Sequence, residues 1–259
     1  MVARVLAIAG SDPSGGAGIQ ADLKTYAAFG VYGMTAITAL TVQNTQGVSR
    51  VVLSSPDLVR QQMQAVLEDI GVDAIKIGML GNSDVVRAVS GALSGISGIP
   101  IVVDPVMRAK GGDPLLEAHG EVAFRDEILP LATVLTPNLP EASALVGFSV
   151  MDRASMVNAA SRIFDMGVPT VLIKGGHLAD DEAADFLWHA GVGTWLSHRR
   201  VATDHTHGTG CTLSSAIAAG LALGEDMDQA VSTAKDYVTR AIIAAPQLGR
   251  GHGPLWHGA

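Results

Sequence analysis

The feature that most constrains the fold is a repeated alternation between short, almost continuous apolar runs and longer amphipathic stretches. Such runs are typical of strands in a sheet covered on both faces, and the amphipathic stretches between them predict helices. Strand–helix–strand repetition predicts a mainly parallel sheet with right-handed crossovers, so we expect one three-layer α/β domain over residues 1–259. The predicted strands are Val5–Ala9, Thr35–Val42, Ala74–Ile77, Ile99–Val103, Thr133–Leu135 and Val168–Ile173.

The sequence also predicts several helix ends and one departure from the parallel pattern. Ser55-Pro56 places a cap and a first-turn proline before an amphipathic stretch, and Gly71 ends it. Asp152 and Asp226 are the predicted caps of two later helices. Two strand-like runs flank a glycine-bearing turn and predict one antiparallel hairpin near a sheet edge, namely Ala184–His189 and Thr194–His198.

Composition and charge exclude several classes of protein. The chain has 259 residues, 48% of them apolar, with a formal net charge of −8, which argues against a general nucleic-acid or anionic-membrane binder. The single cysteine, Cys211, excludes a disulfide framework and an all-cysteine metal cluster. The N-terminus lacks the pattern of a secretory signal, and the nearly uncharged stretch Leu213–Gly224 falls short of the ~20 residues of a membrane span. We expect a soluble cytoplasmic protein.

Polar residues follow the predicted strands at the point where each strand ends. The glycine-rich segment Gly10–Gly18 follows the first strand, Gln43 the second, Asp104 the fourth, Asn138 the fifth and Lys174 the last. The carboxyl ends of parallel strands meet at one edge of the sheet, where such folds bind ligands. The sequence therefore predicts that these groups line one crevice.

The second glycine-rich segment, Thr206–Thr212, precedes a small-residue helix and is the sharper signal. Consecutive N–H groups at a helix start would form an anion hole for a phosphoryl group in transfer. Cys211 lies in that first turn, where the helix field favours a thiolate that can take a proton from an attacking alcohol. A buried small hydrophobe is the alternative interpretation of a lone cysteine.

Other candidate site residues have ordinary alternatives. Lys174 is suited to neutralise phosphates, or is a solvated surface lysine. Asn138 and Glu141, three residues apart, are suited to hold Mg²⁺ through water, or simply cap a helix. Asp104 ends a very apolar strand and needs a partner or a task. The loop 108–113 is a candidate lid over a phosphate, or an idle surface loop. His205 and His207 lack a third ligand at metal-site spacing.

With these residues assembled, the sequence resembles the hydroxymethylpyrimidine/phosphomethylpyrimidine kinases of thiamine biosynthesis, which belong to the ribokinase-like superfamily. The resemblance spans most of the chain, in order. The matching stretches are AGSDPSGGAGIQADLKT (9–25), ITALTVQNTQGV (37–48), KIGML (76–80), VVDPVMRAKGGDPLL (102–116), LTPNLPEA (135–142), IKGGHL (173–178) and THGTGCTLSSAIAA (206–219).

The resemblance implies a ribokinase-like fold and a particular reaction. Members transfer the γ-phosphate of ATP to the hydroxymethyl group of a pyrimidine and then phosphorylate that monophosphate again, with Mg²⁺, and they usually form homodimers. Cys211 matches the cysteine of the G-T-G-C anion hole, whose other members here are Gly208, Thr209 and Gly210. The matched ATP-binding candidates are Lys174, Asp104 and Thr209, and the matched Mg²⁺-associated residues are Asn138 and Glu141. The matched substrate-pocket residues are Gln43, Gly10, Asp12, Ala17, Val42 and Met79.

Two alternatives to this function remain open. A pyridoxal or pyridoxine kinase shares the cysteine-bearing anion hole, and a substrate panel distinguishes it from a pyrimidine kinase. A non-catalytic binder of the thiamine precursor, with Cys211 as a redox-sensitive thiol, would bind without consuming ATP.

Overall fold

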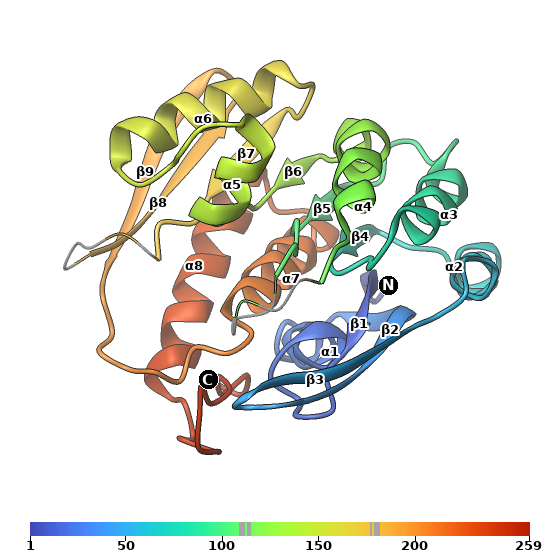
Figure 1. Ribbon diagram of the computed structural model, residues 1–259, viewed down its shortest axis with the longest axis horizontal. Helices are drawn as coiled ribbons and strands as arrows, with labels where there is room; N and C mark the ends of the chain where they lie inside the picture. The colour runs from blue at the N-terminus through green and yellow to red at the C-terminus, as the bar shows by residue number, and fades with distance from the viewer. Residues whose placement is uncertain (109–111, 113–114, 177, 179–181) are drawn as a thin grey trace.

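The computed structural model describes residues 1–108, 112, 115–176, 178 and 182–259. A nine-stranded sheet runs in the order β3-β2-β1-β4-β5-β6-β7-β8-β9 (Figure 1). Strands β2, β1, β4, β5, β6 and β7 pair in parallel, and β3, β8 and β9 add antiparallel pairs at the two edges. The strands are β1 (Arg4–Ser11), β2 (Tyr32–Asn44), β3 (Gly47–Leu53), β4 (Ala74–Ile77), β5 (Ile101–Val103), β6 (Val134–Leu135), β7 (Thr170–Ile173), β8 (Glu182–His189) and β9 (Val192–Arg199).

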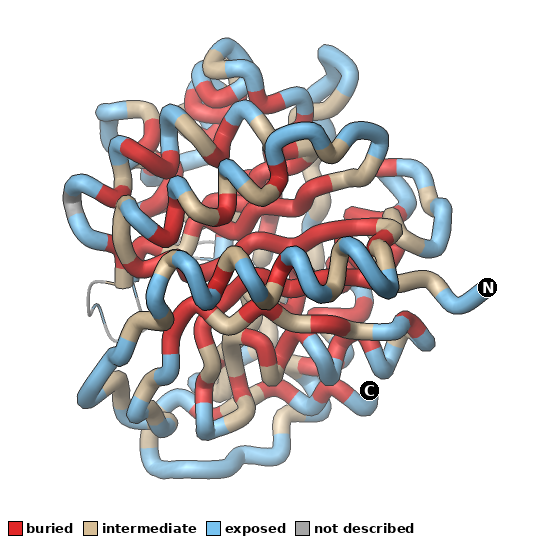
Figure 2. Tube along the Cα trace, turned by 90° about the vertical axis from the view of Figure 1, so that its right-hand side faces the viewer, coloured by how far each residue is buried: buried red, intermediate tan, exposed pale blue. Residues whose placement is uncertain are grey.

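Helices cover both faces of the sheet, as the three-layer prediction requires. In Figure 2 the buried strands pass through the middle of the molecule between helices whose outer sides are exposed. The helices are α1 (Gly18–Ala28), α2 (Pro56–Asp69), α3 (Ser83–Leu93), α4 (Ala118–Ala123), α5 (Leu139–Val146), α6 (Arg153–Asp165), α7 (Thr209–Ala222) and α8 (Met227–Ile243), with a π-helical turn at Phe124–Ile128 and a 3₁₀ turn at Leu129–Leu131.

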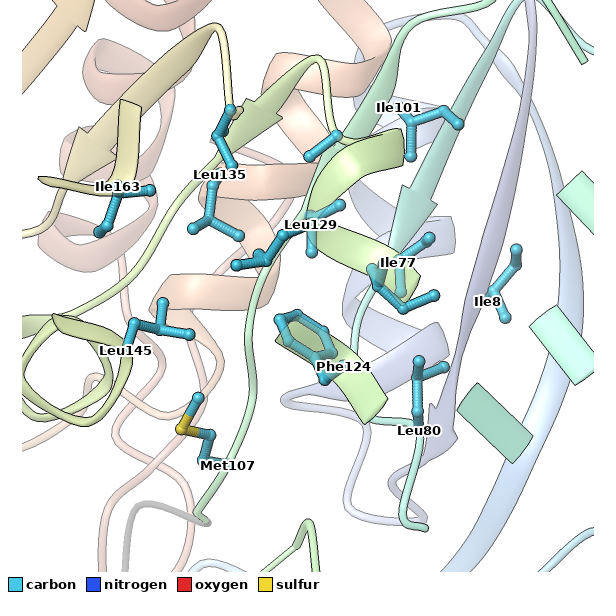
Figure 3. Packing of buried hydrophobic residues seen from close by; sticks show 14 of the residues in the cluster. Ile8, Ile77, Leu80, Ile101, Met107, Phe124, Leu129, Leu135, Leu145 and Ile163 are labelled. Atoms are coloured by element: carbon cyan, nitrogen blue, oxygen red, sulfur yellow. The ribbon is translucent and has the colours of Figure 1, made fainter. Parts of the chain in front are cut away.

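Alternating residues of each central strand supply two separate cores. In β1, Leu6 and Ile8 pack toward α2–α6, while Val5 and Ala7 pack toward α1, α7 and α8. Figure 3 shows the first core, where side chains such as Phe124 and those of the central strands meet. This two-sided burial explains why these strands read as continuous apolar runs.

The strand and helix predictions hold at the centre of the sheet and miss one strand at its edge. Each predicted strand is present, with ends shifted by a few residues at most. The largest shift is at the start of β2, which begins at Tyr32 instead of Thr35. The caps are also confirmed, because the side chains of Ser55, Asp152 and Asp226 each accept a hydrogen bond from the third residue of the following helix. The β8–β9 hairpin is confirmed at its predicted place.

A second antiparallel hairpin, β2–β3, was not predicted. Leu40 pairs with Val52 and Asn44 with Gly47, so β2 runs past the parallel part of the sheet and folds back on itself. Helices do not cover this part on both faces: residues 40–44 of β2 alternate between exposed and half-buried, and no residue of β3 is buried. The strand was not recognised because Gly47–Leu53 includes Ser49 and Arg50 and is therefore not a continuous apolar run. Among the described helices, none is both long and apolar enough to cross a membrane.

Candidate active site

A cavity of about 800 Å³ lies where the carboxyl ends of the parallel strands face the start of α7. Both glycine segments, Gly10–Gly18 and Thr206–Thr212, contribute to its wall. The predicted convergence of distant segments is therefore confirmed. The predicted site residues that line the cavity are Gly10, Asp12, Ala17, Gln43, Met79, Asp104, Asn138, Glu141, Lys174, Gly208, Thr209, Gly210 and Cys211.

Val42 is the exception, because it is not among the residues that line the cavity of the ligand-free protein. Thr41 and Gln43 line the cavity, whereas the side chain of Val42 is exposed. Successive side chains of a strand point to opposite faces, so a residue between two cavity-lining neighbours must face away. The assignment of Val42 to the substrate pocket rests on the family resemblance and stays a prediction.

In the first glycine segment, Gly10–Gly18, the carboxylate of Asp12 binds main-chain N–H groups of the segment itself. Asp12 accepts hydrogen bonds from the main-chain N–H groups of Ser14, Gly16 and Ala17 at 2.8, 3.2 and 2.9 Å, and is itself 2% exposed. Burial alone would raise the pKa of Asp12, but the bonds from His207 and Ser14 outweigh it, and the pKa is lowered. The segment is therefore a preformed wall whose amides are largely occupied.

His207 joins this wall to the second glycine segment, a role that the sequence analysis did not predict. Its Nε2 lies 2.8 Å from Oδ2 of Asp12 and 3.4 Å from Nε2 of Gln43. Thr41 holds the other end of that amide, because its hydroxyl donates to Oε1 of Gln43 at 3.2 Å. The Gln43 side chain thus lies between Thr41 and His207 at the cavity wall.

The second glycine segment, Thr206–Thr212, presents the start of α7. Gly208 has φ +87°, and a Cβ there would overlap with the carbonyl oxygen of Gly16, so glycine is needed for the two segments to meet. The helix has no side-chain cap. Within the described part of the chain, the main-chain N–H groups of Gly210 and Cys211 have no hydrogen-bond acceptor. These open amides, with the helix dipole behind them, are suited to hold an anion.

The Cys211 thiol lines this hole, but its predicted ionisation was wrong for the ligand-free protein. Burial raises the pKa of Cys211 to about 11, and Asp22 and Asp104 raise it further. Lys76 and the N–H of Gly18 act in the opposite direction. The helix field that favours a thiolate is therefore outweighed by desolvation, and the thiol is neutral near pH 7.

Lys174 is held beneath the open amides and is no surface lysine, since its side chain is 13% exposed. Its Nζ donates to Oδ1 of Asp104 at 2.7 Å and lies 3.9 Å from Oε2 of Glu141. Burial would lower the pKa of Lys174, but the two carboxylates outweigh it, so the pKa is raised and the ammonium persists. Asp104 thus has the partner that its apolar strand required.

Asn138 and Glu141 form a capping box at the start of α5. The Asn138 side chain accepts from the Glu141 N–H, and Oε2 of Glu141 accepts from the Asn138 N–H at 2.8 Å. Burial raises the pKa of Glu141 to about 7, Asp104 raises it as well, and Lys174 opposes both. The capping interpretation is confirmed, and both residues also line the cavity.

Two further buried ion pairs line the cavity through their lysines and were missed. Lys76 pairs with Asp22, and Lys235 pairs with Asp185 at 2.6 Å. The signal that could have identified Lys76 is a lysine between two isoleucines in a short apolar run, because a buried ammonium needs a carboxylate partner. The lid predicted at 108–113 lies largely outside the described residues, although Arg108 and Gly112 line the cavity.

Comparison with known proteins assigns the family. The model of the phosphomethylpyrimidine kinase family matches residues 12–256. The chain belongs to this family. It is 48% identical over 260 residues to the hydroxymethylpyrimidine/phosphomethylpyrimidine kinase of Rhizobium meliloti, covering 99% of this chain and 97% of the relative.

Solved structures show the same fold in two kinds of kinase. The phosphomethylpyrimidine kinase of Clostridium difficile matches with a TM-score of 0.83 and 41% identity, over 93% of this chain and 99% of that one. The pyridoxal kinase of Staphylococcus aureus, solved with AMP-PCP and pyridoxal, matches with a TM-score of 0.92 and 37% identity, over 100% of this chain and 94% of that one. This member of the phosphomethylpyrimidine kinase family is thus an ATP-using kinase with a ribokinase-like fold.

Proposed function

We propose that the protein phosphorylates 4-amino-5-hydroxymethyl-2-methylpyrimidine and then its monophosphate, with ATP as donor, in thiamine biosynthesis. The observation that carries the proposal is that Gln43, Cys211 and the open amides of α7 line one cavity. The Gln43 amide is suited to pair with the ring nitrogen and amino group of a pyrimidine. The reacting hydroxymethyl group would then lie between Gln43 and the start of α7.

Each residue of the anion hole has a defined task in this proposal. The N–H groups of Gly210 and Cys211 stabilise charge on the phosphoryl group in transfer. Lys174 neutralises the phosphates of ATP from below, since it is cationic and anchored on Asp104. Cys211 takes the proton of the attacking hydroxyl, which requires that its surroundings favour the thiolate once substrates are bound.

Mg²⁺ belongs to this proposal through the oxygen atoms near Lys174. Mg²⁺ prefers oxygen ligands and keeps several waters, and Glu141 and Asn138 offer such oxygens at the cavity wall. No group of three or more His, Cys, Asp or Glu in the described chain has metal-binding geometry. The residues therefore fit an ion held mainly by phosphates and water, and its charge would neutralise the triphosphate.

The test is ADP release with three acceptors: the hydroxymethylpyrimidine, its monophosphate and pyridoxal, each with and without Mg²⁺. We expect turnover of the first two, with kcat/KM at least about tenfold above that for pyridoxal. Gln43→Leu is the matched variant, because it removes the amide at similar volume. It should raise KM for the pyrimidine about tenfold or more and change KM for pyridoxal less. Preferential turnover of pyridoxal by the unmodified protein would overturn the assignment.

Pyridoxal kinase is the second candidate, favoured by the likeness to the Staphylococcus aureus enzyme over the whole chain. The same assay decides between them, because the anion hole serves either alcohol and only the ring-binding wall differs. Binding of the pyrimidine without ADP release from ATP and Mg²⁺ would instead indicate a non-catalytic binder.

We also propose that the protein is a homodimer, which the β2–β3 hairpin supports. We further propose a cytoplasmic location, where ATP is available. Leu40, Val42 and Val52 lie on one face of the hairpin and are each at least 46% exposed. Contiguous exposed apolar side chains on a strand pair are typical of an interface. Sedimentation of the unmodified protein should give a dimer and Val42→Glu a monomer. A monomeric unmodified protein at assay concentration would contradict this.

A further inference from the structure

Lys76 is a fully buried ammonium group next to the reaction cavity. It lies in β4, and its neighbour Ala74 belongs to the core between the sheet and α1, α7 and α8, so alternation places Lys76 on that face. Its side chain is 0% exposed, and its Nζ lies 2.9 and 3.1 Å from the two carboxylate oxygens of Asp22 in α1. Ser215 of α7 donates a hydrogen bond of 2.6 Å to the same carboxylate.

Stability alone does not account for this cluster, which we call the Lys76 triad (Lys76, Asp22 and Ser215). Removing two charges from water costs several kcal/mol, and apolar residues of similar volume often replace a buried ion pair at no loss of stability. The strands on either side of Lys76 present Ala7 and Val102 at the matching positions. An apolar side chain would therefore suit this face of β4.

The triad is connected to Cys211 through helix α7 and through the cavity. Ser215 follows Cys211 by four residues on α7, so both side chains lie on the same face of that helix. Lys76 and Cys211 line the same cavity. Gly78 keeps the space beside the ammonium free, because a Cβ there would lie 2.9 Å from Nζ of Lys76.

The charges around Cys211 come from several elements, and Lys76 is the one that opposes them most. Asp22 in α1 and Asp104 after β5 disfavour its thiolate, whereas Lys76 favours it more strongly than either of them disfavours it. Lys174 after β7 also interacts favourably with the thiolate. Tyr26 in α1 stays neutral, because burial raises its pKa well above the usual value. A fixed cation thus lowers the pKa of a thiol that burial keeps protonated in the ligand-free protein.

We propose that Lys76 is a positioning residue for Cys211: its ammonium, held by Asp22 and Ser215, stabilises the thiolate that accepts the proton of the substrate hydroxyl. The proposal rests on the proposed role of Cys211. It assigns to the lysine of β4 an electrostatic task that requires no contact with either substrate.

The test uses the fact that the chain has one cysteine, so a thiol reagent reports Cys211 alone. The rate of alkylation by iodoacetamide is measured against pH for the folded protein and for Lys76→Met. Lys76 interacts electrostatically with Cys211, and loss of such an opposite charge shifts a titration by about one pH unit, so the Lys76→Met profile should be displaced upward by that amount. At pH values below the pKa of the thiol, less thiolate is present in the variant, so alkylation should slow. The slowing should be only about three- to tenfold, because a more basic thiolate is also more nucleophilic.

Two further variants separate an electrostatic role from a structural one. The double variant Lys76→Met/Asp22→Asn removes both charges, so it should fold even if the single variant does not, and its profile should still be displaced upward. Lys235→Met removes another largely buried lysine, the one that pairs with Asp185, and should leave the profile in place. A change in access to Cys211 alone would scale the rate equally at every pH without displacing the profile.

Unshifted profiles for both folded Lys76 variants would overturn the proposal, as would an equal shift in Lys235→Met. The result is independent of catalysis. If Cys211→Ala kept full activity, the proposed base would be wrong, yet the alkylation profile would still show whether Lys76 acts on the thiol.

Discussion

The two glycine segments look alike in composition but present their backbones in opposite ways. In Gly10–Gly18 the amides of Ser14, Gly16 and Ala17 are bonded to Asp12 from within the same segment. In Thr206–Thr212 no such carboxylate is present, and the described structure offers no acceptor to the amides of Gly210 and Cys211. The amides of the first segment are thus bonded within it, whereas those of the second are available to a ligand.

The difference shows that glycine content alone does not identify an anion site. What matters is whether an acceptor within the segment already occupies the amides. The second segment is instead held from outside: His207 bonds to Asp12, and Thr212 contacts His257 near the C-terminus at 2.9 Å. Its amides therefore stay open while its position is fixed.

The largest effect expected in the open segment comes from Cys211→Ala. Loss of the proton acceptor should lower kcat about 10²–10⁴-fold with little change in KM, because neither the ring-binding wall nor the amides are altered. The measurement is steady-state ADP release with the pyrimidine. Cys211→Ser, of similar size but far less acidic, should lose about as much. Retention of full activity by either variant would remove Cys211 from the mechanism.

The next effect concerns the contact between the two segments. Gly208→Ala places a Cβ against the Gly16 carbonyl at a left-handed φ, and should reduce the free energy of unfolding by about 3 kcal/mol or more. Gly210→Ala is the matched control. Its Cβ would meet side-chain atoms rather than backbone, Nζ of Lys174 at 3.1 Å and Oδ2 of Asp104 at 3.4 Å, so the loss of stability should be smaller, about 1 kcal/mol. Urea unfolding measures both, and equal losses would contradict the asymmetry.

The closed segment is expected to depend on the charge of Asp12. Asp12→Asn keeps the shape but replaces a carboxylate that accepts several N–H groups, so unfolding should become easier by about 1–3 kcal/mol. Unfolding in urea near pH 7 measures this loss. An unchanged stability would mean that the segment holds its shape without the carboxylate.

Much of the fold and part of the site follow from local rules that need no tertiary information. Central strands such as Val5–Ala9 are recognisable because burial on both faces makes them continuously apolar. The convergence of Gln43, Asp104 and Lys174 follows from parallel topology alone. Helix caps such as Asp152 are local hydrogen bonds and were correctly placed.

What was missed depends on neighbours from distant parts of the chain. Strand β3 pairs with the uncovered end of β2. The protonation of Cys211 follows from burial and from charges on α1, β4 and the end of β5, and no local pattern carries that sum. The occupied amides of the first segment became visible only once the bonds to Asp12 were known.

The smallest predicted effect tests how the open segment is held from outside. His257 is 6% exposed, and burial, aided by Lys24, lowers its pKa to about 4. The unfolded chain, with a pKa near 6.5, therefore binds a proton that the folded protein does not, so stability is fully present above about pH 6.5 and is lost as the pH falls toward 4. His257→Gln cannot titrate and should lose about 1–2 kcal/mol less than the unmodified protein between pH 7 and pH 4.5. Urea unfolding at these two pH values provides the comparison. Equal losses of stability in both proteins would show that protonation of His257 does not contribute to the loss of stability at low pH.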